Sequence, residues 1–144
     1  MKIICFALLT TCCLLTACNS AKKTVANMPA ISILSGTWEL NYISGPRIAF
    51  DGLYPNKKPT ITLDVANSKV MGNTSCNSFN GLLKADGNKI SFTQPLAMTQ
   101  MMCLGEGENV FVSTLKKVNS WSVSNGNILN FIMGDIAVMR FTKK

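Results

Sequence analysis

The chain has 144 residues, of which 47% are hydrophobic, and a formal net charge of +7 at pH 7. It contains no histidine, so the commonest general base and the commonest metal ligand of proteins are missing. The lysines form separate pairs such as Lys116-Lys117. Such dispersion is unlike a continuous nucleic-acid-binding patch, and we expect no nucleic acid as a partner.

The N-terminus has the organisation of a secretory signal peptide. Lys2 precedes an apolar run over residues 3–15, about half of the roughly 20 residues that a membrane-spanning helix needs. The tetrad Leu15-Thr16-Ala17-Cys18 resembles the lipobox of bacterial lipoproteins. That resemblance implies cleavage after residue 17 and a lipid on Cys18. The alternative is an uncleaved apolar helix, or a plain signal peptide in which Cys18 is incidental.

A lipid on Cys18 makes the membrane a partner of the chain. Two or more acyl chains hold a protein stably on a bilayer. The residues after Cys18 are Asn-Ser-Ala-Lys-Lys and carry no acidic sorting signal. We therefore expect an outer-membrane anchor that faces the periplasm, a tether over residues 18–34 and one domain over residues 35–144.

The cysteine count predicts one disulfide. Of six cysteines, three lie in the signal peptide and Cys18 carries the lipid, which leaves Cys76 and Cys103. An even pair in an oxidising compartment favours a disulfide over the alternative of two buried free thiols.

The rest of the chain predicts a mainly β fold. Short runs alternate polar and apolar residues at period two, and Asp-Gly or Asn-Gly turns separate several of them. The expected strands cover residues 37–42, 60–65, 89–92, 120–123, 128–132 and 137–141. Many short antiparallel strands at this spacing are typical of a small barrel or a sandwich.

One α-helix is expected at about residues 106–118. Glu106 and Glu108 lie in its first turn and Lys116-Lys117 in its last, as the helix dipole favours. An apolar stripe recurs at Phe111, Leu115 and Val118. We expect this helix to close one end of a barrel or to pack against its side.

The central segment resembles the META domain family, which includes HslJ-like heat-shock lipoproteins. Ten residues carry the resemblance: Gly72, Cys76, Asn77, Phe79, Gly81, Leu96, Ala97, Thr99, Met101 and Cys103. Gly36-Thr37-Trp38 also resembles the first strand of the family, and Leu82-Leu83 departs from it where an aromatic residue is common. The resemblance implies a barrel-like antiparallel β domain with one helix, frequently on a lipoprotein, and implies no particular reaction.

No arrangement of residues proposes catalysis. The seven carboxylates show no paired spacing, and the chain holds neither a Gly-x-Ser-x-Gly elbow nor a phosphate-binding glycine loop. We expect no enzyme activity, no cofactor and no metal. Met98, Met101, Met102 and Cys103 could together capture Cu(I), but methionine commonly fills cores and a disulfide would consume the thiolate. Asn73, Asn77 and Asn80 could present amides to a ligand, although asparagines beside glycines more often bond the backbone at bends.

The expected function is binding. The lead hypothesis is a monomeric envelope lipoprotein that binds a protein or a cell-wall component in envelope maintenance or stress response. The alternative is an anchored inhibitor of a lysozyme or protease, which would use a loop over residues 46–59 with Phe50, Tyr54, Lys57 and Lys58. The same loop could instead fold over an open end of the barrel.

Overall fold

One antiparallel sheet of ten strands forms the body of the protein. The computed structural model describes residues 30–144. The spatial order of the strands is β5-β6-β8-β9-β10-β1-β2-β3-β4-β7, and every neighbouring pair is antiparallel. Their bounds are β1 (Gly36–Ile43), β2 (Thr60–Asp64), β3 (Lys69–Asn73), β4 (Ser78–Leu82), β5 (Lys84–Asp86), β6 (Lys89–Ser91), β7 (Ala97–Met98), β8 (Ser120–Ser124), β9 (Ile128–Met133) and β10 (Ile136–Lys143). The prediction of a mainly β, barrel-like domain is confirmed.

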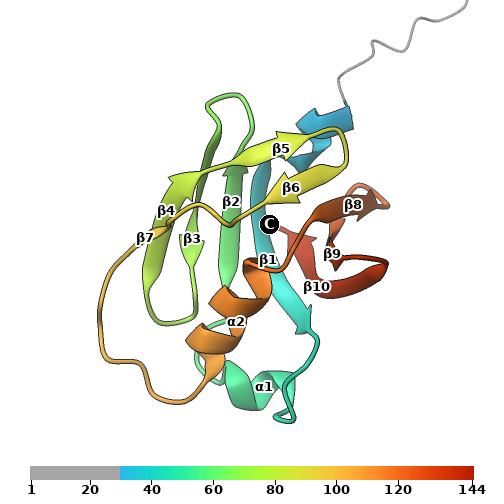
Figure 1. The fold of residues 1–144 in the computed structure, drawn as a ribbon. Helices are drawn as coiled ribbons and strands as arrows, with labels where there is room; N and C mark the ends of the chain where they lie inside the picture. The colour runs from blue at the N-terminus through green and yellow to red at the C-terminus, as the bar shows by residue number, and fades with distance from the viewer. Residues whose placement is uncertain (1–29) are drawn as a thin grey trace, which may run out of the picture.

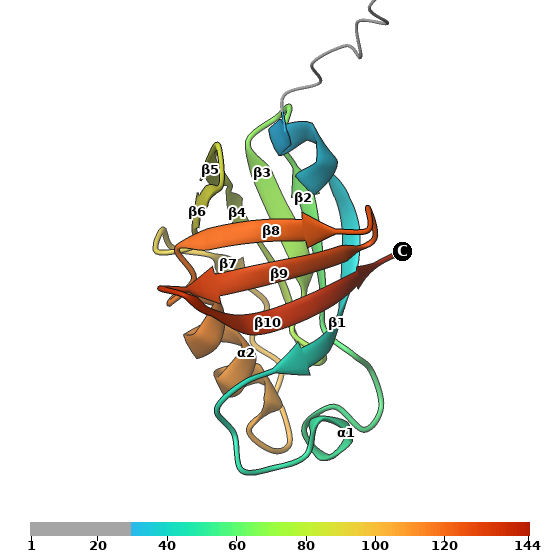
Figure 2. The same cartoon turned by 90° about the vertical axis from the view of Figure 1, so that its right-hand side faces the viewer.

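The sheet curls into a half-barrel (Figures 1 and 2). Strands β4 and β5 lie near opposite ends of the spatial order, yet only Leu83 separates them in the chain. The sheet must therefore bend back on itself. The amide of Leu83 donates to the Ser68 carbonyl at 2.9 Å, and its side chain is buried at the corner.

The core lies inside the curl. Alternate residues of β2 and β9 point inward, as the period-two pattern predicted. In β1 the alternation holds at Trp38 and Leu40, but a register shift with β10 leaves Tyr42 exposed and the adjacent Ile43 buried. Trp38 and Phe131 are fully buried, and the ring of Phe131 packs at 5.2 Å from Phe92 and 5.1 Å from Phe141. Within this core of mainly aliphatic side chains, aromatic rings from separate segments therefore pack against one another.

Strand β10 departs from strict alternation. Val138 and Met139 are adjacent and both are buried, and the register with β9 shifts between Ala137 and Met139. A β-bulge of this kind turns two successive side chains inward and bends the strand. It helps the sheet to curl.

The predicted helix is shorter than expected. Helix α2 (Gly107–Leu115) ends before the two lysines, which lie in a turn that ends at Val118. Phe111, Leu115 and Val118 are nonetheless buried, so the apolar stripe was predicted correctly. Among residues 30–144, no helix is long and apolar enough to cross a membrane.

Two short helical elements were not predicted. The 3-10 helix η1 (Ala30–Leu34) ends in the buried Leu34, whose carbonyl accepts a 2.9 Å hydrogen bond from the Trp38 indole. The sequence placed these residues at the end of the tether. Helix α1 (Phe50–Leu53) lies in the long loop between β1 and β2, at the end of the molecule opposite to η1 (Figure 1).

Candidate functional site

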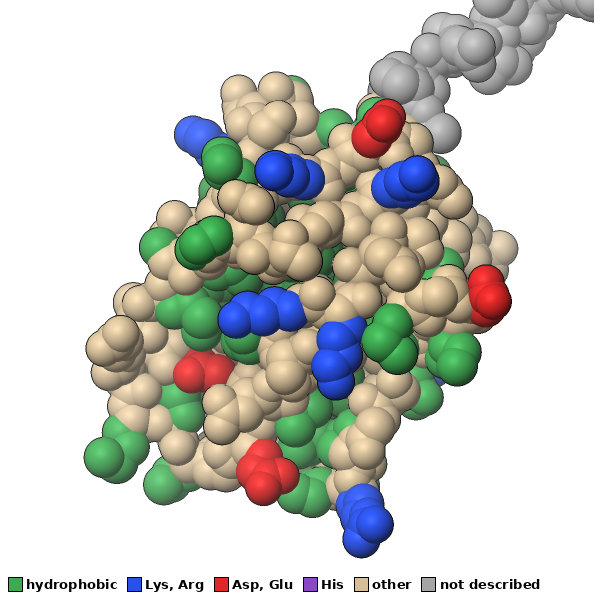
Figure 3. Space-filling model, viewed as in Figure 1, with side chains coloured by type: hydrophobic (Ala, Val, Ile, Leu, Met, Phe, Trp, Pro, Cys, Tyr) green, Lys and Arg blue, Asp and Glu red, His purple; other side chains and the backbone are tan. Residues whose placement is uncertain are grey.

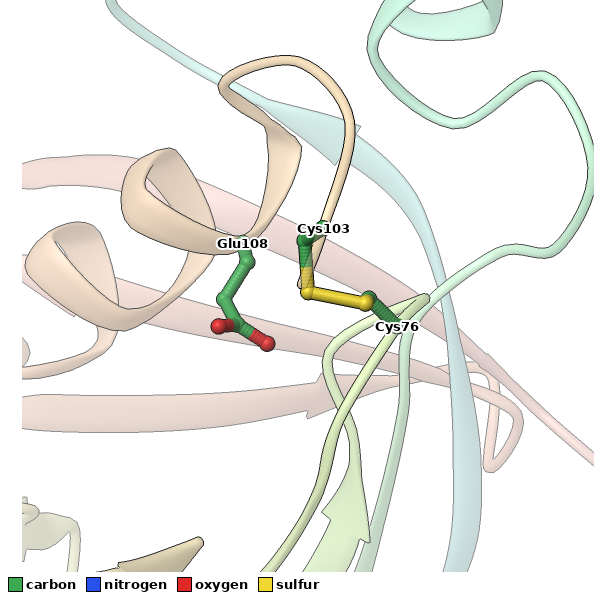
Figure 4. Close-up of side chains that lie close together, drawn as sticks. All are labelled: Cys76, Cys103 and Glu108. Atoms are coloured by element: carbon green, nitrogen blue, oxygen red, sulfur yellow. A yellow bond between two sulfur atoms is a disulfide. The ribbon is translucent and has the colours of Figure 1, made fainter. Parts of the chain in front are cut away.

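The family-motif residues meet at a disulfide. Cys76, in the turn between β3 and β4, is bonded to Cys103, in the loop between β7 and α2, with Cα atoms 5.9 Å apart. Glu108, in the first turn of α2, points toward the two sulfurs (Figure 4). The disulfide therefore joins the β3–β4 hairpin to the loop that leads into the helix. We call this region, with Asn77 and Glu108, the disulfide joint.

Asn77 is the hydrogen-bonding centre of the disulfide joint. Its side chain is buried, and its Oδ1 accepts from the Thr99 hydroxyl and the Met101 amide, both at 2.8 Å. Its Nδ2 lies 3.1 Å from the Met101 carbonyl, 3.1 Å from Glu108 Oε1 and 3.0 Å from Cys103 Sγ. The amide is thus consumed within the protein, and this favours the bend-supporting role for asparagine over ligand binding.

Glu108 accepts hydrogen bonds from the turn between β3 and β4. Its Oε2 accepts from the Thr74 hydroxyl and, at 3.3 Å, from the Asn77 backbone amide. Thr74 is fully buried, and its own amide donates to the Asn77 carbonyl at 2.8 Å. A negative charge at Glu108 also suits the positive end of the α2 dipole. The carboxylate therefore ties the helix to the hairpin.

A metal site is the other chemistry that this cluster suggests. One carboxylate oxygen of Glu108 and the sulfurs of Cys76 and Cys103 lie within 4.8 Å of one another. Metal ions bind the thiolate form of cysteine, which the disulfide removes. The hydrogen bonds described above account for the position of Glu108. We therefore interpret the cluster as a structural element of the fold.

The glycines and the phenylalanine of the motif also serve packing. A Cβ on Gly72 would lie 2.2 Å from the Thr60 carbonyl oxygen, and a Cβ on Gly81 would lie 2.7 Å from a methyl of Leu96. Phe79 is buried and packs at 5.9 Å from the ring of Phe111 on α2. The motif therefore allows strands and loop to approach closely enough to form the joint.

Of the three methionines near Cys103, Met98 packs against the core as the packing alternative predicted, whereas Met101 and Met102 do not. Met101 is 60% exposed, Met102 94% and Leu104 96%. The backbone of Met101 is held by Asn77 on both sides, so its side chain is directed outward. These side chains form an apolar surface on the loop before α2. The sequence could not reveal it, because methionine beside cysteine is equally compatible with burial.

The candidate binding loop over residues 46–59 is partly internal. Tyr54 is buried, its hydroxyl donates to the Gly107 carbonyl at 3.0 Å, and burial raises the pKa of Tyr54 to about 12. Phe50 is half-buried against Tyr54, with ring centroids 5.1 Å apart. Lys57 and Lys58 are exposed. The loop folds over one end of the sheet, and only part of it faces solvent.

A basic cleft is the feature that the sequence reasoning missed. It has a volume of about 660 Å³ and lies between the β5–β6 hairpin and the turn after α2. Its lining includes Lys84, Lys89, Lys116 and Lys117 together with Leu83, Ile90 and Val118. The lysines come from segments about 30 residues apart, so no local signal announced them. A cleft with an apolar floor and a few polar groups is the usual form of a ligand site.

The fold and the disulfide joint define a class of small, disulfide-linked, half-barrel β domains with one helix across the curl. A META domain family model matches residues 31–144. The chain belongs to the META domain family, as the motif residues predicted. A search among curated proteins gives no match.

Two solved structures share this fold. One is the NMR structure of a protein from Burkholderia xenovorans, with a TM-score of 0.60 and 20% identity over 80% of this chain and 86% of that chain. The other is the crystal structure of a DUF4847 family protein from Bacteroides vulgatus, with a TM-score of 0.52 and 15% identity over 76% of this chain and 93% of that chain. At these identities the likeness is one of fold alone.

The predictions for the N-terminus concern residues that the structure does not describe. The signal peptide, Cys18 and most of the tether lie outside the described residues. The lipid anchor and the location of the protein therefore stay predictions.

Proposed function

We propose that this chain is a non-enzymatic lipoprotein of the bacterial envelope, whose META domain binds an envelope component. The lipobox-like tetrad that ends at Cys18 supports the anchor, and the apolar run before it has the length of a signal peptide. The proposed location is the outer membrane with the domain in the periplasm. The proposed role is in envelope maintenance or stress response, as for HslJ-like members of the family.

The observation that favours binding over catalysis is that the polar groups of the disulfide joint form hydrogen bonds with one another. Asn77 and Glu108 bond each other at 3.1 Å, and the remaining partners of both are protein groups. A general base or a ligand for a reacting group needs a lone pair that is open to substrate. In the joint, Asn77 Oδ1 accepts two hydrogen bonds, and each carboxylate oxygen of Glu108 accepts at least one. The motif therefore supports the domain, and we assign recognition to the surface.

Two further carboxylates in the described residues, those of Glu39 and Asp64, have partners within the protein. Glu39 pairs with Lys144 at 2.6 Å on the surface. Asp64 accepts from the side chain and the amide of Asn67, at 2.8 and 3.1 Å, and these hydrogen bonds lower the pKa of that carboxyl. Both groups are therefore engaged by partners within the protein, which supports the proposal of a protein without enzyme activity.

The anchor is tested by fractionating cells that express the full chain. Wild-type protein and a Cys13→Ser variant should sediment with the outer membrane, whereas Cys18→Ser protein should be soluble in the periplasm. Cys13→Ser is the matched control, because it removes a thiol from the same segment. Membrane association of the Cys18→Ser protein would contradict the anchor.

The binding role is tested without the lipid. The mature Cys18→Ser chain should co-sediment saturably with envelopes purified from the same cells, since binding then depends on the domain alone. Failure to sediment at any accessible concentration would contradict a binding function. This result is independent of the fractionation, so anchor and binding can fail separately.

A further inference from the structure

The lysines of the basic cleft form no ion pair with another residue among residues 30–144. Lys84, Lys89, Lys116 and Lys117 are all exposed at its rim, and Asp86 is the one acidic residue that lines it. Within residues 30–144, the single ion pair joins Lys144 to Glu39 of β1. In the spatial order of the sheet, strands β8, β9 and β10 lie between β1 and the β5–β6 hairpin of the cleft. Four ammonium groups around one hollow raise the local concentration of anions. Figure 3 shows this face, with lysine and arginine side chains standing over β5, β6 and the end of α2.

The floor of the cleft is apolar. Leu83, Ile90 and Val118 line it and are otherwise buried in the core, and the half-buried Ala85 lies beside them. A site for a free inorganic anion needs donors on all sides and gains nothing from such a floor. A floor of aliphatic side chains under a ring of lysines instead matches a ligand with an anionic head and an apolar body.

The position of the cleft relative to the proposed anchor narrows the class of ligand that the cleft would meet. The described chain begins at η1, which lies at the same end of the molecule as the tip of the β5–β6 hairpin (Figures 1 and 2). Residues 19–29 precede it and can span at most about 40 Å when extended. A tether of that reach holds the cleft among lipid headgroups at a high effective concentration, so that a weak intrinsic affinity suffices.

We propose that the cleft between the β5–β6 hairpin and the end of α2 binds the headgroup of an anionic phospholipid. The lysines contact the phosphate, and the floor of Leu83, Ile90 and Val118 contacts the glycerol and the first methylenes. The inference deepens the proposed function, since it names the envelope component and the surface. It makes the domain a second, reversible contact with the membrane beside the covalent anchor.

The test uses the mature chain with Cys18→Ser, so that no covalent lipid contributes. Dihexanoyl phosphatidylglycerol, kept below its micelle concentration, is titrated into the isotope-labelled protein. Amide chemical shifts should change at residues 84–91 and 116–119, and should change much less with dihexanoyl phosphatidylcholine or with inorganic phosphate. Binding should weaken as salt rises, because exposed charges are screened.

Two double variants make the charge comparison. Lys116→Gln with Lys117→Gln should weaken binding about 25-fold, at roughly fivefold for each lysine near an anionic headgroup. Lys57→Gln with Lys58→Gln removes the same charge from the loop at the opposite end of the molecule and should bind as wild type. Thr93→Glu places a negative charge on an exposed residue of the cleft lining and should also weaken binding.

Three results would overturn the proposal. One is equal binding of inorganic phosphate or of a soluble anionic polymer at the same residues, which would mean that the cleft recognises its ligands by their negative charge alone. Another is loss of binding in the Lys57→Gln, Lys58→Gln variant to the same extent, which would mean that net charge decides. The third is the absence of shifts in the cleft while the chain still sediments with envelopes, which would preserve the binding function and remove this ligand.

Discussion

The side-chain amide of Asn77 and the carboxylate of Glu108 lie 3.1 Å apart and connect the β3–β4 hairpin to helix α2. They are 31 residues apart in the chain. The covalent link between Cys76 and Cys103 runs beside this hydrogen bond (Figure 4). The family motif therefore describes one structural joint, in which a hydrogen-bonded pair and a disulfide fix the same two elements.

Asn77→Ala should lower the free energy of unfolding by about 3 kcal/mol or more. The change removes the Oδ1 acceptor of the part-buried Met101 amide and Thr99 hydroxyl, and it removes one of the donors to the Glu108 carboxylate. Each group left unpaired costs about 1–3 kcal/mol. Urea unfolding measures the effect. Asn80→Ala, on the exposed face of β4, is the control and should change stability by less than about 0.5 kcal/mol. Equal stability of the two variants would show that the joint contributes little.

Loss of the disulfide should destabilise the domain by about 3–4 kcal/mol. The two cysteines are 27 residues apart, and a cross-link over that length removes this much chain entropy from the unfolded state. Thermal unfolding of the oxidised protein, with and without a reducing agent, measures the difference. The Cys76→Ala, Cys103→Ala variant should be equally destabilised and insensitive to the reductant. A reductant effect in that variant would point to another cause.

Gly72→Ala should destabilise the protein by about 3 kcal/mol or more. A methyl group there would lie 2.2 Å from a backbone oxygen of β2, and neighbouring strands cannot separate without losing their ladder. Denaturant unfolding of the purified variant tests this. Gly52→Ala is the matched control, because its new methyl meets only the flexible side chain of Ile48 at 3.1 Å. A Gly72→Ala protein as stable as wild type would mean that β2 and β3 can shift apart.

Stability should fall as pH rises from about 10 to about 12. Burial raises the pKa of Tyr54 from 10.0 to about 12 in the folded protein, so the folded state holds its proton more tightly than the unfolded state. The resulting stabilisation is complete below pH 10 and disappears as pH rises through the folded pKa. Tyr54→Phe should remove this dependence and cost about 1 kcal/mol for the hydrogen bond to Gly107. An unchanged alkaline profile in Tyr54→Phe would assign the effect to other groups; Tyr42→Phe, at an exposed site, is the control.

The sequence predicted the strands that alternate clearly and missed those that carry the motif. Strand β1 alternates clearly from Thr37 to Leu40, whereas β3 and β4 contain Gly72 and Gly81, which are poor strand formers. Those glycines are needed where backbone and side chains approach closely, a property of the folded state alone. Helix α1, of four residues, is too short to give a periodic signal.

The candidate site shows the same division. The pairing of Cys76 with Cys103 was predicted by counting, because the expected signal peptide and lipid anchor account for the other four cysteines. The basic cleft could not follow from any local pattern, since Lys84 and Lys116 become neighbours only when the chain passes through β6, β7 and α2. Dispersed charge in the sequence is therefore a poor guide to the surface potential of a curled sheet.

The most direct test of the account is the intact mass of the mature protein purified from its own membranes. The account predicts a chain that begins at Cys18, carries acyl chains on that residue, and gains the mass of two hydrogens when the Cys76–Cys103 disulfide is reduced. A chain that retains residues 1–17, or one that begins at an unmodified Cys18, would contradict the lipoprotein at the centre of the proposal.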